Sequence, residues 1–469
     1  MNAVKIVATL GPASAAKDCI ADLVRAGMDA ARLSFSHGSH EEHAQLIRTV
    51  RQVGQELDRP IAILQDLQGP RIRTGPLRNG QLVLLRQGER VVLTGAETET
   101  AAGVISVAHP SLHRHVSAGQ RILLDNGLME LRVEQVRAGL ITCVVVRGGE
   151  LGANKGVNIP VSDLGIPSFT GKDREDLEFG LDMGVDWIAM SFVGGAKDIL
   201  PVREALKARR MRIPVMAKIE RASALKHLPA ILDAFDGIMV ARGDLGVELP
   251  PEEVPVWQKA MVAQARSKGK AVLVATQMLE SMMHELQPTR AEASDVANAV
   301  LDGADAVMLS GETAIGSYPV ETVSMMARII ETALAIYQPQ ESGHTGRFKS
   351  PEAVARAACS LAADIPHTSI VVLTQRGMTA SLVSKNRPKA PVYALTPTTE
   401  IARQLALCWG ITPIPIKYPS TTEEALIVVE RVALQRGLAG PGDMVIVVGS
   451  APFARRGRTN FIKVHRVAR

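Results

Sequence analysis

Val215-Met-Ala-Lys-Ile-Glu220 is the first of three short apolar runs that end in polar side chains; the others are Ile238-Met-Val-Ala-Arg-Gly-Asp-Leu-Gly246 and Val272-Leu-Val-Ala-Thr276. Each run has the length and composition of a β-strand buried on both faces. The polar groups are the ammonium of Lys218, the carboxylates of Glu220 and Asp244, and the hydroxyl of Thr276. Because ligands bind at the carboxyl ends of parallel strands, we expect these side chains to converge there.

Runs of the same kind recur along much of the chain, with helix-length amphipathic segments between most of them. The eight expected strands are Val4 to Leu10, Ala30 to Ser36, Ile61 to Leu67, Trp187 to Val193, Pro214 to Glu220, Gly237 to Val240, Ala271 to Thr276 and Ala306 to Ser310. Eight strands that alternate with helices predict a (β/α)8 TIM barrel, an α/β fold. We assign residues 1–70 and 169–340 to this catalytic barrel.

The pattern of apolar and polar residues changes at two points along the chain. Residues 71–168 carry short β-like pieces with Gly-rich turns, which predicts an all-β domain inserted into a barrel loop, able to close over the site as a lid. Beyond a junction at Ser342 to Gly346, strands alternate with helices again, and residues 345–469 predict a C-terminal open α/β domain. Gly54 and Gly180 are interpreted as helix ends, and Thr289-Arg-Ala-Glu292 as a capping box.

Composition excludes some classes of function. The net charge of +5 is small for 469 residues and aromatic residues make up only 3%, so nucleic acid is not an expected partner. No apolar run is long enough to suggest a membrane span. The four cysteines are scattered without paired spacing, and a strand-like run from Val4 leaves no room before it for a signal sequence. We therefore expect a cytoplasmic protein.

Two acidic groups and one ammonium form the candidate centre. Lys218 and Glu220 are two residues apart on a strand and so project to the same side; their structural alternative is a buried ion pair in the barrel mouth. Asp244 lies in a Gly-Asp-Leu-Gly turn whose N–H groups could bind an anion, although such a turn alone is often only a turn. Two carboxylates with few other protein ligands suit Mg²⁺.

Basic residues follow the second and third strands. Arg32-Leu-Ser-Phe-Ser-His-Gly38 carries an arginine that needs an anionic partner if it faces inward, and phosphate is a natural one. Asp66-Leu-Gln-Gly-Pro-Arg-Ile-Arg73 adds two more arginines, unless it is a solvated turn into the inserted domain.

These residues strongly resemble the pyruvate kinase family over essentially the whole chain. The matching segments are Ala8 to Pro12, Arg32 to Gly38, Asp66 to Thr74, Lys155 to Asn158, Met216 to Glu220, Ala241 to Gly246, Ala275 to Ser281, Pro288 to Glu292, Ser294 to Gly303 and Met308 to Ala314. The resemblance implies phosphoryl transfer from phosphoenolpyruvate to ADP, which gives ATP and an enolate that is protonated to pyruvate. It also implies a homotetramer.

The resemblance further assigns roles. Glu220 and Asp244 would hold Mg²⁺, or Mn²⁺, and Lys218 would neutralise the phosphoryl group in flight. Thr276 and the backbone N–H groups of Gly243 and Asp244 would hold the substrate carboxylate. The residues that match phosphate and nucleotide contacts in the family are Arg32, His37, Arg73 and Lys155. Two rivals stay open: another Mg²⁺-dependent barrel enzyme acting on enolpyruvate or a 2-oxo acid, and a catalytically silent binding paralogue.

Regulation is expected in the C-terminal domain. Many pyruvate kinases bind a phosphorylated effector at a turn that corresponds here to Thr374, Arg376, Gly377 and Thr379, although Arg376 stands where the family usually has a small hydroxyl residue. Gly194 is a second departure, because the family usually carries an arginine there.

Potassium is the last expectation. Members that require K⁺ carry Asn in place of Ser34 and an acidic residue in place of Arg71. The permanent charge of Arg71 could replace a bound K⁺ and repel cations, so we expect dependence on Mg²⁺ but not on K⁺. Ser34, Ser36 and Asp66 would then be a vestigial cation site; the alternative is that Arg71 only points to solvent.

Overall fold

The computed structural model describes residues 3–96, 98–160, 166–337, 349–453, 455 and 457–468. The predicted end of the barrel at residue 340, the start of the last domain at 345 and the junction between them lie outside the described residues.

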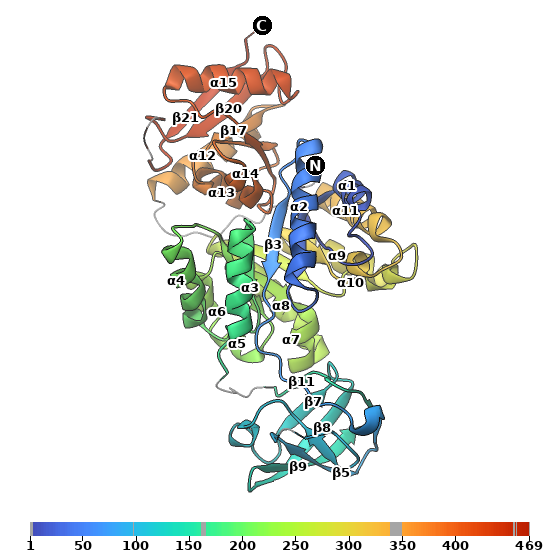
Figure 1. Cartoon of the computed structure of the whole chain (residues 1–469). Coiled ribbons are helices and arrows are strands. Elements are labelled where there is room, and N and C mark those ends of the chain that lie inside the picture. Colours follow the sequence, from blue (N-terminus) through green and yellow to red (C-terminus); the bar gives the residue numbers. More distant parts are fainter. Residues whose placement is uncertain are drawn as a thin grey trace.

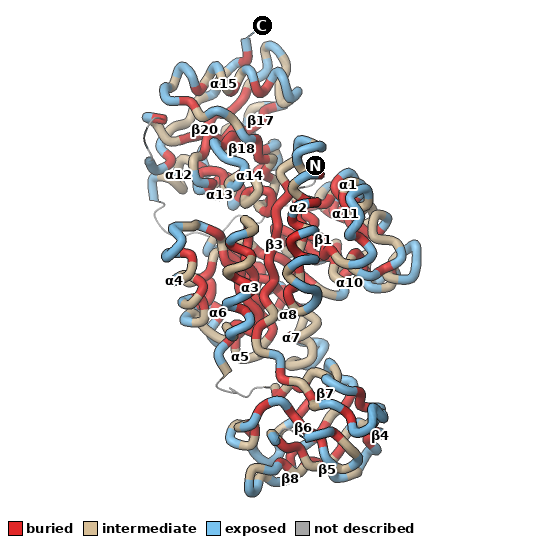
Figure 2. The backbone as a smooth tube through the Cα atoms, in the orientation of Figure 1, coloured by how far each residue is buried: buried red, intermediate tan, exposed pale blue. Residues whose placement is uncertain are grey.

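Eight parallel strands close into a barrel in the order β1-β16-β15-β14-β13-β12-β3-β2. They are β1 (Lys5–Thr9), β2 (Met28–Ser34), β3 (Ala62–Asp66), β12 (Trp187–Met190), β13 (Val215–Ile219), β14 (Gly237–Ala241), β15 (Ala271–Ala275) and β16 (Ala306–Leu309). Nearly every residue in them is buried, as expected of strands packed on both faces (Figure 2). Val7, Leu64 and Met216 belong to the cluster that fills the barrel, while a second, larger cluster joins the strands to the helices. The predicted TIM barrel is confirmed.

The helices that surround the barrel follow its strands in the chain. They are α1 (Lys17–Ala26), α2 (His40–Glu56), α3 (Gly171–Asp182), α4 (Leu200–Ala208), α5 (Ala222–Lys226), α6 (Leu228–Ala234), α7 (Arg242–Glu248), α8 (Val254–Ser267), α9 (Arg290–Asp302), α10 (Gly311–Ala314) and α11 (Pro319–Ile336). The predicted capping box begins α9, where Thr289 Oγ1 accepts from the Glu292 N–H and the Glu292 carboxylate accepts from the Thr289 N–H.

The interpretation of Gly54 and Gly180 as helix ends was wrong, because both lie inside helices, in α2 and α3. Their small size serves packing instead. The amide of Gln65 occupies the space where a Cβ on Gly180 would stand, and the carbonyl of Arg59 would lie 2.9 Å from a Cβ on Gly54.

An all-β unit lies between β3 and α3. Its strands are β4 (Val83–Leu85), β5 (Arg90–Thr94), β6 (Val104–Ser106), β7 (Arg121–Leu124), β8 (Met129–Arg137), β9 (Leu140–Arg147), β10 (Gly149–Leu151) and β11 (Val157–Asn158). They form a six-stranded sheet, β11-β7-β8-β9-β5-β6, and a two-stranded sheet, β10-β4, around a hydrophobic cluster of their own. Figure 1 shows this unit beside α7, at the end of the barrel where β3 leaves it.

The C-terminal part is a five-stranded sheet, β19-β18-β17-β20-β21, flanked by helices at the other end of the barrel (Figure 1). Its elements are α12 (Ser350–Asp364), β17 (Ser369–Leu373), α13 (Met378–Lys385), β18 (Val392–Thr396), α14 (Thr399–Leu405), β19 (Ile411–Pro415), α15 (Thr422–Gln435), β20 (Met444–Gly449) and β21 (Phe461–Arg466). Four of the strands were expected from the sequence, at Ile370 to Thr374, Val392 to Thr396, Ile411 to Ile416 and Met444 to Val448. The antiparallel edge strand β21 was missed because polar residues interrupt its apolar pattern and no residue in it is fully buried.

Polar contacts dock this domain on the barrel. Arg387 pairs with Asp305 at 2.7 Å, Arg403 pairs with Asp186 at 2.8 Å, and the ammonium of Lys5 donates to the Ile411 carbonyl at 2.9 Å. Among the described residues, none of the helices combines the length and apolar character needed to cross a membrane.

Candidate active site

Lys218 lies at the centre of a buried charge cluster at the carboxyl ends of β3 and β13. Its Nζ is 3.1 Å from Asp66 Oδ1 and 2.8 Å from Glu220 Oε1, and it donates to Ser191 Oγ at 2.7 Å. Burial disfavours the ammonium, but the two carboxylates outweigh it, and the pKa of Lys218 lies above its usual value. The cation is therefore permanent and is held in one position.

Arg32 meets the same cluster from β2. Its Nε donates to Asp66 Oδ2 at 2.7 Å and its Nη1 donates to Thr9 Oγ1 at 3.0 Å. Burial alone would raise the pKa of Asp66, but Lys218 and Arg32 hold it below its usual value. The anionic partner expected of an inward-facing arginine is thus a protein carboxylate in this structure.

Glu220 and Asp244 offer the oxygen ligands for a divalent cation. Glu220 is almost fully buried, its Oε2 accepts from the Phe192 N–H at 2.6 Å, and burial raises its pKa, with Lys218 opposing and Asp244 adding to the shift. Within the described ranges, no group of three or more His, Cys, Asp or Glu side chains could hold a metal ion. Two carboxylates with open positions are what Mg²⁺ needs when substrate oxygens complete its shell, so the donor set fits this ion.

Thr276 has a strained backbone. Its φ of 70° lies in the left-handed region, which a β-branched residue rarely adopts. Arg242 holds this turn from α7: its Nη2 donates to the Thr276 carbonyl at 2.6 Å and its Nη1 contacts both oxygens of Asp295, at 2.6 and 2.5 Å. The Thr276 hydroxyl accepts from the Gly243 N–H at 2.7 Å. Two groups predicted to hold one carboxylate are therefore neighbours.

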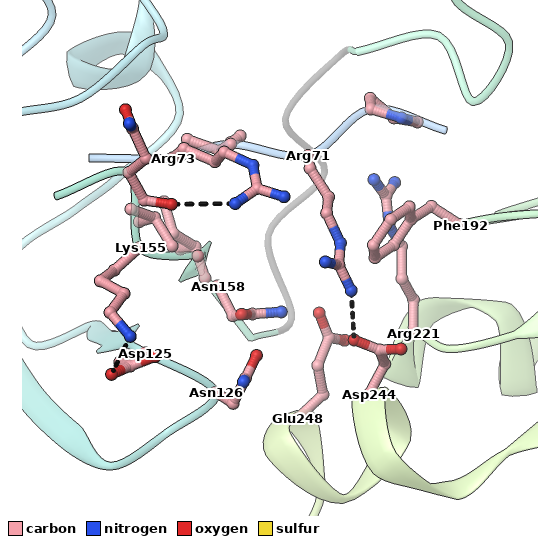
Figure 3. A pocket seen from close by; sticks show the side chains of 16 residues that line it. Arg71, Arg73, Asp125, Asn126, Lys155, Asn158, Phe192, Arg221, Asp244 and Glu248 are labelled. Atoms are coloured by element: carbon pink, nitrogen blue, oxygen red, sulfur yellow. Dashed lines mark hydrogen bonds and ion pairs between the residues drawn. The ribbon is translucent and has the colours of Figure 1, made fainter. Parts of the chain in front are cut away.

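A cavity of about 240 Å³ separates the all-β unit from this end of the barrel (Figure 3). Arg71 points across it toward Asp244, with Nη2 3.9 Å from Oδ1, so its guanidinium is directed at the site rather than to solvent. On the opposite wall Arg73 donates to the Asn154 carbonyl at 2.9 Å, and Lys155 Nζ lies 3.0 Å from Asp125 Oδ2.

The pKa of His37 reflects the positive charge of the arginines around it. Burial lowers its pKa first, and the charges of Arg71, Arg73 and Arg32 lower it further. The imidazole is therefore neutral near pH 7, and all three arginines lie near enough to His37 for their charges to act on it.

The structure thus brings most predicted residues to one end of the barrel. The exceptions are the candidate effector residues in the C-terminal domain, at the opposite end. There the Thr379 hydroxyl contacts Thr459 Oγ1 at 2.9 Å in a buried position, Thr374 is buried, and Arg376 and Gly377 line a separate cleft. Ser34 stands opposite Asp66 in the register of β2 and β3, and Ser36 follows two residues later.

Several site residues were missed from the sequence. They are the Lys218 partner Ser191, the Glu220 donor Phe192, the Arg242–Asp295 pair, and the cavity-lining residues Asn126, Asn158 and Arg221. A signal existed for Ser191 and Phe192, which end a predicted strand; Asp295 lies 53 residues from Arg242 and gave none. At Gly194, the N–H donates to Asp198 Oδ2 at 2.8 Å, and the nearest atom to an added Cβ is 3.8 Å away, so nothing blocks the arginine usual in the family.

Buried carboxylates, a fixed ammonium and converging arginines at the carboxyl ends of barrel strands define an enzyme that works on a phosphorylated or carboxylated anion. Comparison with known proteins narrows the class. Residues 1–323 match the family model described as pyruvate kinase, barrel domain, and residues 352–465 match the model described as pyruvate kinase, alpha/beta domain. The chain belongs to the pyruvate kinase family, a family of phosphotransferases.

Individual relatives agree. The chain is 44% identical to pyruvate kinase 2 of Synechocystis over 98% of its own length and 78% of the relative, and 44% identical to the pyruvate kinase of Agrobacterium vitis over 99% and 96%. A solved pyruvate kinase from Cryptosporidium parvum superposes with a TM-score of 0.93 at 33% identity, covering 99% of this chain and 96% of that one. Family membership sets aside the rival of an unrelated barrel enzyme.

Proposed function

We propose that the chain transfers a phosphoryl group from phosphoenolpyruvate to ADP and so forms pyruvate and ATP, as a glycolytic enzyme of the cytoplasm. The observation that carries this function is Lys218, fixed between Asp66 and Glu220 beside a carboxylate pair at the barrel mouth. A permanent, positioned cation stabilises the charge that moves with a transferring phosphoryl group. A coupled assay for ATP formation from phosphoenolpyruvate and ADP tests the function, and an inactive protein would leave only the silent paralogue.

Glu220 and Asp244 would hold the divalent cation, Mg²⁺ or Mn²⁺. When bound, the ion would neutralise and orient the carboxylate and phosphate oxygens of the substrate. The charge of Asp244 adds to the raised pKa of Glu220, and this supports the assignment because a cation between the two carboxylates relieves their repulsion.

The substrate carboxylate would bind at Thr276 and at the N–H groups of Gly243 and Asp244. The N–H groups of Gly243 and Asp244 lie in the first turn of α7, where the helix end favours an anion, and the Gly243 N–H already donates to Thr276 Oγ1 at 2.7 Å. Thr276 would also lie near the path of the proton that reaches the enolate. The hold of Arg242 on the strained turn supports a fixed position for its hydroxyl.

Arg32, His37, Arg73 and Lys155 would contact phosphate and nucleotide. Arg73 and Lys155 belong to the all-β unit or its hinge, so closure of this unit as a lid would bring their charge to the phosphates and exclude water. The lid, as we propose it, spans residues 71–168, between the barrel segments 1–70 and 169–340, with a regulatory domain at 345–469.

Replacing Arg73 with methionine is expected to lower turnover without affecting folding. One charge-assisted hydrogen bond to a phosphate is worth about 2 kcal/mol, or roughly thirtyfold in rate. Among the residues that the structure describes, the side chain donates one hydrogen bond, to the Asn154 carbonyl, so the melting temperature should be unchanged. Arg90→Met, which removes an exposed lid arginine paired with Glu134, is the matched control. Unchanged kinetics in Arg73→Met protein with a normal melting curve would refute the role.

We further propose a homotetramer regulated by a phosphorylated effector that binds at the turn containing Thr374, Arg376, Gly377 and Thr379. The glycine has a φ of 83° and precedes α13, whose first N–H groups have no side-chain cap, which favours an anion. Substrate saturation curves should shift to lower phosphoenolpyruvate in the presence of a sugar phosphate or a nucleotide. Curves that no member of such a panel moves would indicate an unregulated enzyme.

The enzyme, as we propose it, needs no K⁺. Both oxygens of Asp66 lie against cations of the protein, Arg32 and Lys218, which leaves the vestigial set of Ser34, Ser36 and Asp66 without a free carboxylate. Arg71 adds a guanidinium that lies 3.9 Å from Asp244 and whose charge lowers the pKa of His37.

A further inference from the structure

A second cleft lies at the amino ends of the barrel strands, far along the molecule from the active site. It has a volume of about 710 Å³ and is lined by α4, by the segments that lead into β13, β15 and β16, and by α13 and α14 of the C-terminal domain. Figure 1 shows α13 and α14 on the side of the C-terminal domain that meets the barrel, with α4 on the barrel beyond them. The volume is in the range of small-molecule sites.

The walls of this interdomain cleft carry a large excess of positive charge. Of the lining residues that the structure describes, nine are Lys or Arg and two are Asp. Both aspartates are already paired with arginines of the cleft: Asp236 contacts Arg203 at 2.8 Å and Asp305 contacts Arg387 at 2.7 Å. These two pairs leave the cleft wall with a net positive charge that its own carboxylates do not neutralise.

Lys270 and Lys385 face each other across the domain boundary. The side chain of Lys385 lies over Gly269, in the space where a Cβ on that glycine would stand, which places its ammonium beside the neighbouring Lys270. Lys270 Nζ donates to the Phe235 carbonyl at 2.7 Å, and among the ion pairs of the described residues neither lysine takes part. Two like charges held together cost free energy unless an anion joins them.

The titration of both lysines agrees with this geometry. Although Lys385 is accessible to solvent, desolvation by the surrounding walls lowers its pKa, and the charge of Lys270 lowers it further. Desolvation also lowers the pKa of Lys270, against the opposing fields of Asp236 and Asp233. A bound anion would reverse these shifts.

We propose that the interdomain cleft binds a small metabolite with at least two phosphate groups, held by Lys270 of the barrel and Lys385 of the C-terminal domain. Several cations match several phosphate charges, and Leu206, Met211 and Met378 supply an apolar wall for the carbon skeleton. Because its ligands come from both domains, the bound anion ties the C-terminal domain to the barrel. The site is separate from the active site. Two residues of the candidate effector turn, Arg376 and Gly377, line the same cleft, whereas the Thr379 hydroxyl is buried against Thr459.

Inorganic pyrophosphate is the probe, titrated calorimetrically into the full-length protein without Mg²⁺ or substrates. We expect the Lys270→Met/Lys385→Met double variant to bind it at least about a hundredfold more weakly, because each ammonium removed deletes one charge-assisted hydrogen bond worth roughly tenfold in affinity. Lys349→Met, which removes an exposed lysine outside the cleft, should bind like the unaltered protein. Absence of binding to the unaltered protein at millimolar pyrophosphate would overturn the proposal.

Two further variants separate this site from the others. Full loss of binding in Arg73→Met/Lys155→Met, with binding kept in the double cleft variant, would place pyrophosphate only in the active site and overturn the proposal. Loss confined to Arg458→Met, a variant of the C-terminal domain outside the cleft, would place it at Arg458 and also overturn the proposal.

Thermal unfolding provides a readout independent of catalysis. Pyrophosphate should raise the melting temperature of the unaltered protein. Without pyrophosphate, the double cleft variant should melt at or above the temperature at which the unaltered protein melts without pyrophosphate. Adding pyrophosphate should not change the melting temperature of this variant. An equal rise in both proteins would contradict the proposal. Because neither measurement uses the catalytic reaction, the outcome is independent of the coupled assay.

Discussion

Replacing Lys218 with methionine is expected to lower kcat by roughly a thousandfold, which corresponds to about 4 kcal/mol of transition-state stabilisation. The reason is that Lys218 is the buried cation positioned between Asp66 and Glu220, and no water can take over its charge there. Because the missing interaction acts on the transition state, kcat should fall far more than the affinity for phosphoenolpyruvate. Steady-state kinetics at saturating Mg²⁺ measure both quantities.

The same substitution also removes a structural ion pair, so a control must separate the two effects. Leaving Asp66 and Glu220 without their ammonium is expected to destabilise the fold by about 3 kcal/mol. The control is Lys259→Met, which removes the ammonium of Lys259 in α8 from the largely buried carboxylate of Asp302 in α9. This variant should lower the stability of the fold and leave kcat unchanged. If Lys218→Met lost stability but kept its turnover, Lys218 would be only the structural partner that its spacing also allows.

The barrel could be predicted because its signal is local. Strands such as Val215–Ile219 are buried on both faces, so each appears in the sequence as a short continuous apolar run rather than as alternating polar and apolar residues. β21 was not predicted, for the opposite reason. Its sequence, Phe461-Ile-Lys-Val-His-Arg466, lies at the edge of the sheet, and it becomes a strand by pairing with β20, which comes earlier in the chain. Gly180 failed because its role is set by Gln65, a residue on another element.

The site divides along the same line. The spacing of Lys218 and Glu220 placed both side chains on one face of one strand, and the position of Asp244 after the next strand placed it nearby. The rule that a buried arginine needs an anion was right for Arg32, but its partner Asp66 became visible only when β2 and β3 paired in register. The contacts by which Arg242 holds the Thr276 turn could not be predicted from the sequence, because they join α7 to the end of β15 and to α9.

The spacing of Lys218 and Glu220 along the strand also does not tell whether they form a structural ion pair or a catalytic group. Lys218 and Glu220 do form the ion pair that the structural interpretation required, at 2.8 Å. What favours catalysis is the surroundings: Asp66 on the other side of the ammonium and Asp244 near enough to act on the pKa of Glu220. A purely structural pair gains nothing from further carboxylates that repel one another.

Arg71→Glu is expected to make activity depend on K⁺ or to leave the enzyme nearly inactive, whereas the unaltered enzyme should need Mg²⁺ alone. The guanidinium lies 3.9 Å from Asp244 and contributes to the low pKa of His37, so its charge acts on the centre itself. At about 4 Å and an effective dielectric near 20, a cation entering beside it would be repelled by about 4 kcal/mol. Reversing the charge turns that repulsion into attraction and removes the positive charge that the site relies on.

The measurement is initial velocity in tetramethylammonium buffer free of sodium and potassium, with Mg²⁺ saturating, before and after addition of KCl. The unaltered enzyme should change by less than about twofold, while an Arg71→Glu enzyme that retains activity should gain at least about tenfold, well within the roughly 4 kcal/mol available. Arg78→Glu, a charge reversal at an exposed lid arginine paired with Glu99, controls for the change in net charge. An unaltered enzyme that is almost inactive in this buffer and recovers with K⁺ would show that Arg71 does not replace the ion. The two charges of the Arg71–Asp244 pair would then serve only to hold the lid hinge against α7.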